Sequence, residues 1–529
     1  MAELNRENWL QERSSGVLAH ISSLPGDFGI GNIGSPARAF IDFLAEAGFR
    51  QWQICPIGPT GYGDSPYQAF SSFAGNAYFL DLNVLIADGL LEEQEVQPLR
   101  GLPPGEVDYG RLYTEFWTIL NAAYRRFVDS GEDQVEGSSF KGFCRDNAHW
   151  LDAYAAFMAL KAHHGGRPWT EWEPAYRDFT RVDLAALPPE VAEVAQSHRF
   201  YQFLFFHQWN QLREYAHARK VSIIGDLPIF VPLDSADTWQ FPQVFKLDKS
   251  GHPTVVAGVP PDYFSETGQH WGNPIYDWEY LKQTGYQWWA QRLGFSFKCC
   301  DILRLDHFRA FDSYWEIPSW TDDARKGLMC PGPGLDFFVE MDRQLPRMPI
   351  IAEDLGYITE GVVHLRHAAG LPGMKILQFG YGHDDNNVNL PHFYPRDSVV
   401  YTGTHDNDTT RGWLSSLSGP GAARIRRYFG LEEEDNSAWP LIEAGFASVS
   451  RMAIFPVQDL LDLGSEARLN RPGTSAGNWK WRFTAAQLEQ LRRERLEQLL
   501  SLQDLYDRNG DSRQREYSAP PVDTALERH

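Results

Sequence analysis

The chain alternates between short apolar runs, which are typical of β-strands, and longer stretches with helical periodicity. Eight apolar runs predict strands, at residues 17–24, 49–57, 221–226, 301–306, 348–355, 374–379, 398–406 and 447–457. Within residues 301–306, Ile302, Arg304 and Asp306 share one face, and the intervening leucines point the other way. This strand is therefore predicted to have one apolar face in packing and one face that ends in charged groups.

The stretches between these runs predict helices. The first covers residues 36–47, with Ser35 as its N-cap and Gly48 as its stop. After the second strand no comparable apolar run occurs before Val221, and helical patterns fill the gap, at residues 113–128, 140–163 and 197–219. We interpret this part as an inserted helical subdomain. A further helix is predicted at residues 280–293.

Eight strands separated by helical or irregular stretches indicate an α/β fold. They fit a parallel (β/α)₈ TIM barrel better than a doubly wound sheet. We expect one barrel domain over residues 1–505, with inserted, mainly helical subdomains between barrel strands at about 59–220 and 227–298. Residues 506–529 are polar and are expected to form a disordered tail.

Composition narrows the class of protein. The chain has 48 basic and 70 acidic residues, a net charge of −22, which argues against nucleic acid or an anionic membrane as partner. Aromatic residues make up 14%, and core packing explains most of them, although aromatic rings also stack on sugars. The five cysteines lack a framework spacing, and we find neither a signal peptide nor a membrane-spanning run. We therefore expect a cytoplasmic globular protein.

Four predicted strands end in an acidic residue, namely Asp226, Asp306, Glu353 and Asp406. In a parallel barrel all four would lie at the carboxyl-terminal face, where barrel enzymes carry their active sites. Arg304 and His405 lie beside two of them in the sequence. Because like charges crowded together are costly, this arrangement indicates a functional site more than a solvated surface.

Glycoside chemistry requires a pair of carboxyl groups, a nucleophile and a general acid/base. Asp306 suits the nucleophile, since the neighbouring Arg304 favours its ionised form. Glu353 suits the acid, because the other carboxylates should raise its pKa, and Asp406 would bind sugar hydroxyls. Two other interpretations stay open: a structural ion pair at a strand end, and a divalent metal site, against which Arg304 argues.

Several segments, in order along the chain, resemble the 4-α-glucanotransferases of glycoside hydrolase family 77, which are relatives of the α-amylases. The matching segments are 58–67 (GPTGYGDSPY), 225–230 (GDLPIF), 259–264 (VPPDYF), 271–274 (WGNP), 303–308 (LRLDHF), 351–356 (IAEDLG), 403–407 (GTHDN) and 478–482 (NWKWR). The resemblance extends from about residue 16 to 483. It implies a barrel without the separate carboxyl-terminal β-sandwich of amylases, and no obligate metal or organic cofactor.

The resemblance also implies roles for individual residues. The catalytic set is Asp306 as nucleophile, Glu353 as acid/base and Asp406 as third carboxylate. The residues implied to line the sugar subsite at the cleavage point are Arg304, His405 and Asp226. Those implied to contact glucan on either side of it are Tyr67, Ser65, Asp262 and Trp271, while Tyr62 matches a secondary glucan-binding surface in some members. The chain departs from the family pattern at Gly382 and His383, near a point where many relatives have a sugar-contacting acid, so no residue is carried over there.

We therefore predict a retaining enzyme that moves an α-1,4-glucan segment from a donor to the 4-OH of glucose or another glucan. The alternatives are a retaining α-glucan hydrolase, which uses water as acceptor, and a catalytically idle glucan-binding protein. The intact Asp306, Glu353 and Asp406 argue against the idle protein.

The stretch 259–271, which contains prolines and aromatic residues, is predicted to cover the acceptor. In that interpretation Asp262 would bind hydroxyl groups, and Tyr263, Phe264 and Trp271 would cover a sugar ring. The alternative is a rigid surface loop that packs on the inserted helices.

Overall fold

The structure is a computed structural model that describes residues 9–509, apart from residues 62, 132, 262–265, 346, 357, 381–388, 433 and 475. Four predicted site residues, Tyr62, Asp262, Tyr263 and Phe264, therefore lie outside the described residues, as do residues 510–529 of the predicted tail and the pair Gly382 and His383. The remaining predicted site residues are all described.

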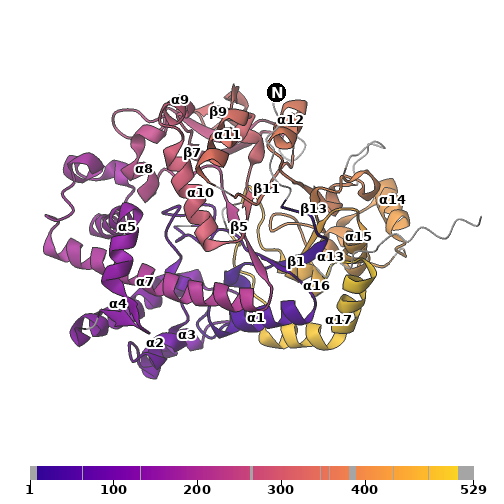
Figure 1. Cartoon of the computed structure of the whole chain (residues 1–529), viewed down its shortest axis with the longest axis horizontal. Helices are drawn as coiled ribbons and strands as arrows, with labels where there is room; N and C mark the ends of the chain where they lie inside the picture. Colours follow the sequence, from indigo (N-terminus) through magenta and orange to yellow (C-terminus); the bar gives the residue numbers. More distant parts are fainter. Residues whose placement is uncertain are drawn as a thin grey trace, which may run out of the picture.

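Eight parallel strands form a closed barrel, which confirms the predicted fold class (Figure 1). In chain order they are β1 (Ser14–Leu18), β2 (Gln51–Gln53), β5 (Ser222–Leu227), β8 (Ile302–Leu305), β11 (Ile350–Ala352), β12 (Gly373–Ile376), β13 (Ser398–Tyr401) and β14 (Met452–Pro456). Each strand pairs with its sequence neighbours in the barrel, and β1 closes the ring by pairing with both β2 and β14. Every predicted strand thus has its counterpart.

Most strands are shorter than the apolar runs that predicted them. The run 17–24 pairs only as far as Leu18, whose partners are Gln53 and Pro456. Strand β2 ends at Gln53, and Pro456 has no N–H to continue the ladder, so the chain turns into a 3₁₀-helix at Ile21–Ser23. The apolar residues beyond the strand remain buried without belonging to the sheet.

Alternation along the strands separates two apolar cores. Ile302 and residues from six other barrel strands pack together inside the barrel. Leu303 and Leu305 join the larger core between the barrel and its surrounding helices. This confirms the predicted two faces of β8 and places the buried side chain of Arg304 on the inner one.

Helix α1 (Ser35–Glu46) covers the outside of the barrel between β1 and β2. Its N-cap is Gly34 and not Ser35, because the backbone N–H of Ser35 donates to Asp81 Oδ2 at 3.3 Å. A residue distant in sequence thus replaces the predicted local cap. Between β2 and β5 the helices are α2 (Leu82–Ala87), α3 (Glu93–Arg100), α4 (Tyr109–Ser130), α5 (Phe140–His163), α6 (Pro174–Arg177) and α7 (Pro189–Ala218).

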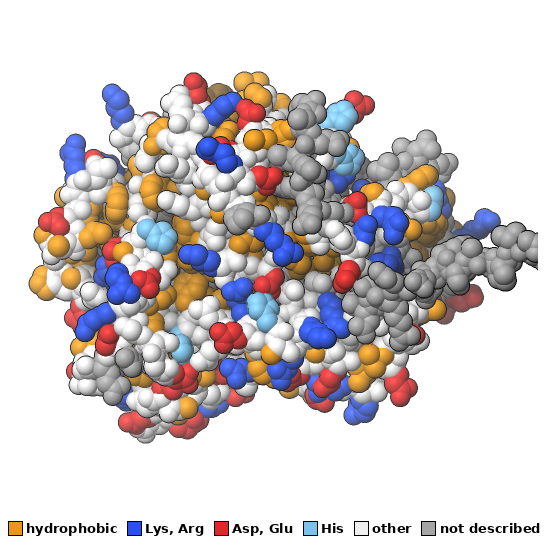
Figure 2. Space-filling model, in the orientation of Figure 1, with side chains coloured by type: hydrophobic (Ala, Val, Ile, Leu, Met, Phe, Trp, Pro, Cys, Tyr) orange, Lys and Arg blue, Asp and Glu red, His pale blue; other side chains and the backbone are white. Residues whose placement is uncertain are grey.

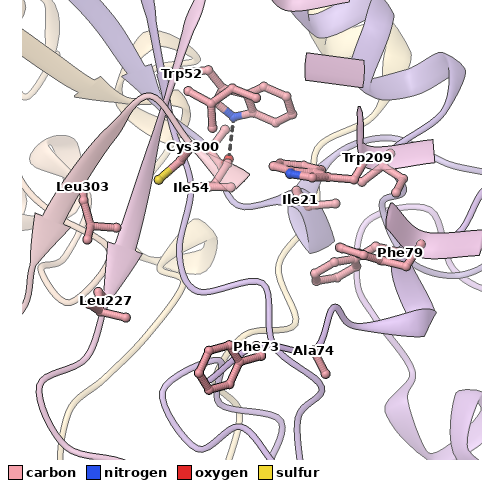
Figure 3. Packing of buried hydrophobic residues seen from close by; sticks show 14 of the residues in the cluster. Ile21, Trp52, Ile54, Phe73, Ala74, Phe79, Trp209, Leu227, Cys300 and Leu303 are labelled. Carbon is pink, nitrogen blue, oxygen red and sulfur yellow. Dashed lines mark hydrogen bonds between the residues drawn. The ribbon is translucent and has the colours of Figure 1, made fainter. Parts of the chain in front are cut away.

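These helices form a lobe beside the barrel, drawn in purple in Figure 1. Helix α5 packs along α7, and the long α7 also contacts α1 and β5. Where the lobe meets the barrel, Trp209 of α7 belongs to the same apolar core as Cys300 and Leu303 (Figure 3), and its Nε1 donates to the carbonyl oxygen of Cys299 at 3.1 Å. Trp52 of β2 is buried in the same core and donates from Nε1 to the carbonyl oxygen of Ala19 (2.8 Å).

A four-stranded antiparallel sheet lies outside the barrel, and the sequence analysis did not predict it. Its order is β10 (Leu328–Pro331), β9 (Ser313–Pro318), β6 (Val255–Val259) and β7 (Gln269–Pro274). Two hairpins from different barrel connections build it, so its pairing joins segments distant in sequence. The predicted helix 280–293 is instead two, α9 (Trp278–Gln283) and α10 (Gln287–Cys299), because Gly285 and Tyr286 both have positive φ between them.

The remaining helices complete the outer layer. They are α8 (Ala236–Gln240), α11 (Leu335–Gln344), α12 (Glu360–Ala368), α13 (Thr410–Ser416), α14 (Gly419–Phe429), α15 (Trp439–Ala447), α16 (Val457–Leu460) and α17 (Ala485–Leu505). Helix α17 packs against α1 and so joins the two ends of the described chain. The predicted disordered tail is wrong for residues 506–509, because Arg508 is buried, its Nη1 donates to the carbonyl oxygen of Ser14 (2.9 Å) and Asn509 pairs with Ser14. The part described after β14 contains helices and loops without a β-sandwich. Within the described residues, no helix is long and apolar enough to cross a membrane.

Candidate active site

Four acidic side chains lie at the carboxyl-terminal end of the barrel: Asp226, Asp306, Glu353 and Asp406. Asp306 and Glu353 directly follow β8 and β11. Their backbone N–H groups extend the ladder by one residue, donating to the carbonyl oxygens of Leu227 and Leu305, both at 3.0 Å. Because the strands are parallel and adjacent, this pairing places the two acids next to each other on neighbouring strands.

Arg304 joins two of the carboxylates from the inner face of β8. Its Nη1 donates to both oxygens of Asp226 at 2.8 Å, and its Nη2 lies 2.8 Å from Asp306 Oδ1. The side chains of Arg304 and Asp226 are 4% and 1% exposed, whereas that of Asp306 is 27% exposed. The buried Arg304–Asp226 pair therefore supports the site from below. Of the two carboxylates that Arg304 binds, Asp306 is the one that faces the open end of the barrel.

Burial raises the pKa of Asp306 above its ordinary value, the Arg304 guanidinium opposes the increase, and Asp226 and Asp406 add to it. The sequence predicted the effect of Arg304, but burial of Asp306 is a property of the folded protein. The direct ion pair still gives the Asp306 carboxylate a cation at hydrogen-bond distance.

Glu353 has a different environment. Burial raises its pKa to about 8, and the charge of Asp306 adds to the increase, while Arg304 and two hydrogen bonds oppose it. Those bonds come from the backbone N–H groups of His307 (2.7 Å to Oε2) and Leu355 (3.0 Å to Oε1). Glu353 therefore holds a proton at neutral pH, as a general acid must.

Tyr67 connects Asp226 to the histidine side of the site. Its hydroxyl donates to Asp226 Oδ2 at 2.7 Å and lies 2.9 Å from His405 Nε2. The two rings also stack, with centroids 5.2 Å apart and an interplanar angle of 21°. Burial raises the pKa of the Tyr67 hydroxyl well above its ordinary value, so Tyr67 remains a donor. Ser65 supports this residue, because its Oγ accepts the N–H of Tyr67 at 3.3 Å.

His405 and Asp406 follow β13 on the opposite side of the opening. His405 Nε2 lies 3.4 Å from Asp406 Oδ2, and its Nδ1 is buried without a hydrogen-bond partner among the described residues. This assigns the ring hydrogen to Nε2, because a buried N–H without an acceptor is costly. The Asp406 side chain is 45% exposed, so part of its acceptor capacity faces outward.

Trp271, on β7, packs against His307, which follows the nucleophile candidate Asp306 in the chain. The two rings meet edge to face, with centroids 4.7 Å apart. His307 has a left-handed backbone (φ 50°, ψ 47°), which turns its N–H toward Glu353. The sequence analysis did not single out His307, although it lies within the segment 303–308 that carried the resemblance.

Two residues that hold Asp406 were not predicted from the sequence. Asn470 Nδ2 donates to Asp406 Oδ1 at 2.6 Å, and Arg468 Nη2 donates to the backbone carbonyl oxygen of Asp406 at 2.7 Å. Both lie in a polar loop after β14 that shows no periodicity or spacing by which its neighbour could be deduced.

The fold and site together define a class. A parallel barrel carries, at the ends of its strands, a carboxylate paired with arginine, a carboxyl group that stays protonated at neutral pH and a third exposed carboxylate. Two carboxyl groups in such different environments are what a barrel enzyme that acts on glycosidic bonds requires.

Comparison with known proteins gives the family. The model of glycoside hydrolase family 77, described as 4-alpha-glucanotransferase, matches residues 19–488. The chain belongs to this family and is a 4-alpha-glucanotransferase. It is 47% identical over 483 residues to the 4-alpha-glucanotransferase of Thermus thermophilus, covering 90% of this chain and 96% of that protein. A chloroplastic/amyloplastic 4-alpha-glucanotransferase of Solanum tuberosum is 39% identical, over 90% of this chain and 84% of that protein.

Solved structures agree with this assignment. The amylomaltase of Streptococcus agalactiae, solved in complex with acarbose, matches with a TM-score of 0.89 and 38% identity, over 94% of this chain and all of that one. The amylomaltase of Corynebacterium glutamicum matches with a TM-score of 0.72 over 92% of this chain and 75% of that one. At 18% identity the second likeness shows the fold alone.

Proposed function

We propose that the enzyme transfers α-1,4-glucan segments by two displacements through a covalent intermediate on Asp306. A carboxylate oxygen of Asp306 forms a bond to the anomeric carbon as the glycosidic bond breaks, and Glu353 gives its proton to the departing glucan oxygen. In the second step the 4-OH of an acceptor glucan attacks that carbon, its proton returns to Glu353 and the ester to Asp306 breaks. Two inversions retain the α-configuration.

The observation that carries this assignment is the different support of the two carboxyl groups. Asp306 has Arg304 Nη2 at 2.8 Å, whereas Glu353 accepts the backbone N–H groups of His307 and Leu355 and has a pKa of about 8. The proton therefore belongs on Glu353 and the negative charge on Asp306, which is the division of roles that the reaction needs.

The remaining polar groups suit a sugar ring at the cleavage point. Asp406 is exposed and offers acceptor oxygens to sugar hydroxyls. His405 and Tyr67 form a stacked pair with polar edges, and Asp226 is held behind them by Arg304. We assign these residues to binding and to stabilising the positive charge that develops on the sugar in the transition state.

Transfer requires that a sugar, and not water, meets the intermediate. Trp271 packs against His307, whose N–H holds the acid/base Glu353, so an aromatic ring on β7 lies beside the acceptor side of the site. We propose that the stretch 259–271 covers the acceptor and thereby disfavours hydrolysis. Its residues Asp262, Tyr263 and Phe264 stay predictions, as does the secondary glucan surface at Tyr62.

Incubation with maltotriose tests the proposal against hydrolysis. Transfer should produce glucose and longer glucans while the total number of reducing ends stays nearly constant. A steady rise in reducing ends would favour the hydrolase, and no change in product lengths would favour a binding protein.

The proposal also covers the substrates of the enzyme and its location in the cell. We propose maltooligosaccharides and amylose as donors and acceptors. The exposed face in Figure 2 mixes basic with acidic side chains, and the chain as a whole carries a net charge of −22. All five cysteines are free, which supports the proposed cytoplasmic location. We also propose that residues 1–505 act as one catalytic domain with insertions at about 59–220 and 227–298.

A further inference from the structure

The loop that follows β14 reaches across to the turn that carries His405 and Asp406. From α16 the chain passes a 3₁₀-helix at Ser465–Ala467 and arrives at Arg468 and Asn470 beside Asp406. The turn and the loop are more than 60 residues apart in the sequence. Their contact is therefore made by the barrel, whose strands β13 and β14 are neighbours.

Arg468 binds two backbone carbonyl groups at once. Its Nη2 donates to the carbonyl oxygen of Asp406 (2.7 Å), and its Nε donates to the carbonyl oxygen of Asn470 (2.8 Å). Asn470 in turn donates from Nδ2 to Asp406 Oδ1 (2.6 Å). One guanidinium thus holds the carbonyl group of Asp406 and the backbone of Asn470, whose side-chain amide in turn orients the Asp406 carboxylate.

The ends of the turn are held separately. Asp459 of α16 is 1% exposed and accepts the hydroxyl of Thr402 (2.5 Å) and both the N–H and the hydroxyl of Thr410 (2.7 Å each). These bonds lie before and after the turn and do not touch Asp406. Within the turn, the N–H of Asp406 donates to Thr404 Oγ1 (3.3 Å) and that of Thr404 to Asn407 Oδ1 (2.9 Å). Loss of Arg468 would therefore release the Asp406 carbonyl group while the turn and its ends stay anchored, so the fold should survive the change.

We propose that Arg468 is a positioning residue for the third carboxylate. It sets the backbone of Asp406 and, through Asn470, the direction of the Asp406 carboxylate toward the bound sugar. The inference rests on the proposed role of Asp406 in sugar binding. Arginine suits this role because its planar fork donates in two fixed directions, which the single ammonium group of lysine does not.

The first test compares Arg468→Ala, Arg468→Lys and Arg471→Ala in maltotriose disproportionation. Arg471 is an exposed arginine of the same loop and serves as the matched control. We expect Arg468→Ala to lower kcat roughly 10- to 100-fold, because small displacements of a catalytic group have costs of this order. Arg468→Lys should recover part of the loss, Arg471→Ala should equal the wild type, and the thermal unfolding midpoints of all three should stay close to the wild-type value.

The second test separates positioning from a general structural effect. Acarbose affinity is measured for Arg468→Ala in the wild-type background and in an Asp406→Ala background, where no carboxylate remains to be oriented. We expect Arg468→Ala to weaken acarbose binding about tenfold or more in the wild-type background and less than about twofold in the Asp406→Ala background. The reason is that the effects of residues that act as a unit are not additive.

Equal losses in both backgrounds would overturn the proposal, and so would wild-type kcat in Arg468→Ala. A wild-type enzyme that fails to redistribute maltotriose would instead refute the proposed function itself. The two failures are therefore distinguishable in the same set of experiments.

Discussion

The raised pKa of Glu353 has a consequence for stability as well as for catalysis. Its ordinary pKa is 4.5, and burial together with the charge of Asp306 raises it to about 8 in the folded protein. Between these two values the unfolded chain ionises at this position while the folded enzyme keeps its proton. The folded state therefore loses stability as the pH rises through this window, and Glu353→Gln, which cannot ionise, should abolish that loss.

The size of the effect follows from the same two pKa values. Each pH unit above 4.5 lowers the free energy of unfolding by about 1.4 kcal/mol. Ionisation at this site therefore removes about 3 kcal/mol of wild-type stability at pH 7, and just under about 5 kcal/mol once the pH exceeds 8. An unfolding entropy of about 2 cal/mol/K per residue gives about 1 kcal/mol per degree for about 500 residues. The advantage of Glu353→Gln over the wild type should thus grow by about 3 °C between pH 4.5 and pH 7.

The assay is thermal unfolding of both proteins at one scan rate, from pH 4.5 to pH 9. A constant offset is expected in addition, because the amide can accept only one of the two backbone N–H bonds that Glu353 accepts now. The exposed Glu497 on α17 provides the control, since Glu497→Gln should follow the wild type at every pH. A difference between Glu353→Gln and the wild type that does not change with pH would refute the raised pKa, and with it the assignment of Glu353 as the protonated acid.

Three further predictions concern activity. Asp306→Asn should reduce turnover of maltotriose by several orders of magnitude without unfolding the enzyme, because an amide cannot form the ester; a variant that keeps more than a few per cent of the rate would exclude Asp306 as nucleophile. The pH profile of kcat/KM should fall on its alkaline side with an apparent pKa of about 8 as Glu353 loses its proton, and activity that already declines with rising pH near pH 5 would contradict this. Replacing both aromatic residues, Tyr263→Ala with Phe264→Ala, should raise the hydrolytic share of the products; an unchanged ratio of transfer to hydrolysis would show that this stretch does not control the acceptor.

Sequence alone determined the parts of this protein that depend on local pattern. The period of two along residues 301–306 separated Leu303 and Leu305 from Arg304 correctly, because every second side chain of a strand must point the same way. The number of strands followed from the short apolar runs. Because the strands are parallel, the four acidic residues at their ends were expected at the carboxyl-terminal end of the barrel. The ends of the elements were less predictable, since a strand such as β1 stops where its partners stop.

Only the tertiary structure decided which side chains meet. Asp226 and Tyr67 are 159 residues apart, and their hydrogen bond exists because the connection after β2 returns over the mouth of the barrel. Arg468 lies in a loop without a sequence signal and reaches Asp406 only because β13 and β14 are adjacent. The pKa of Glu353 is likewise a property of the folded protein, because it depends on burial and on the distance to Asp306, and neither is written in the order of the residues.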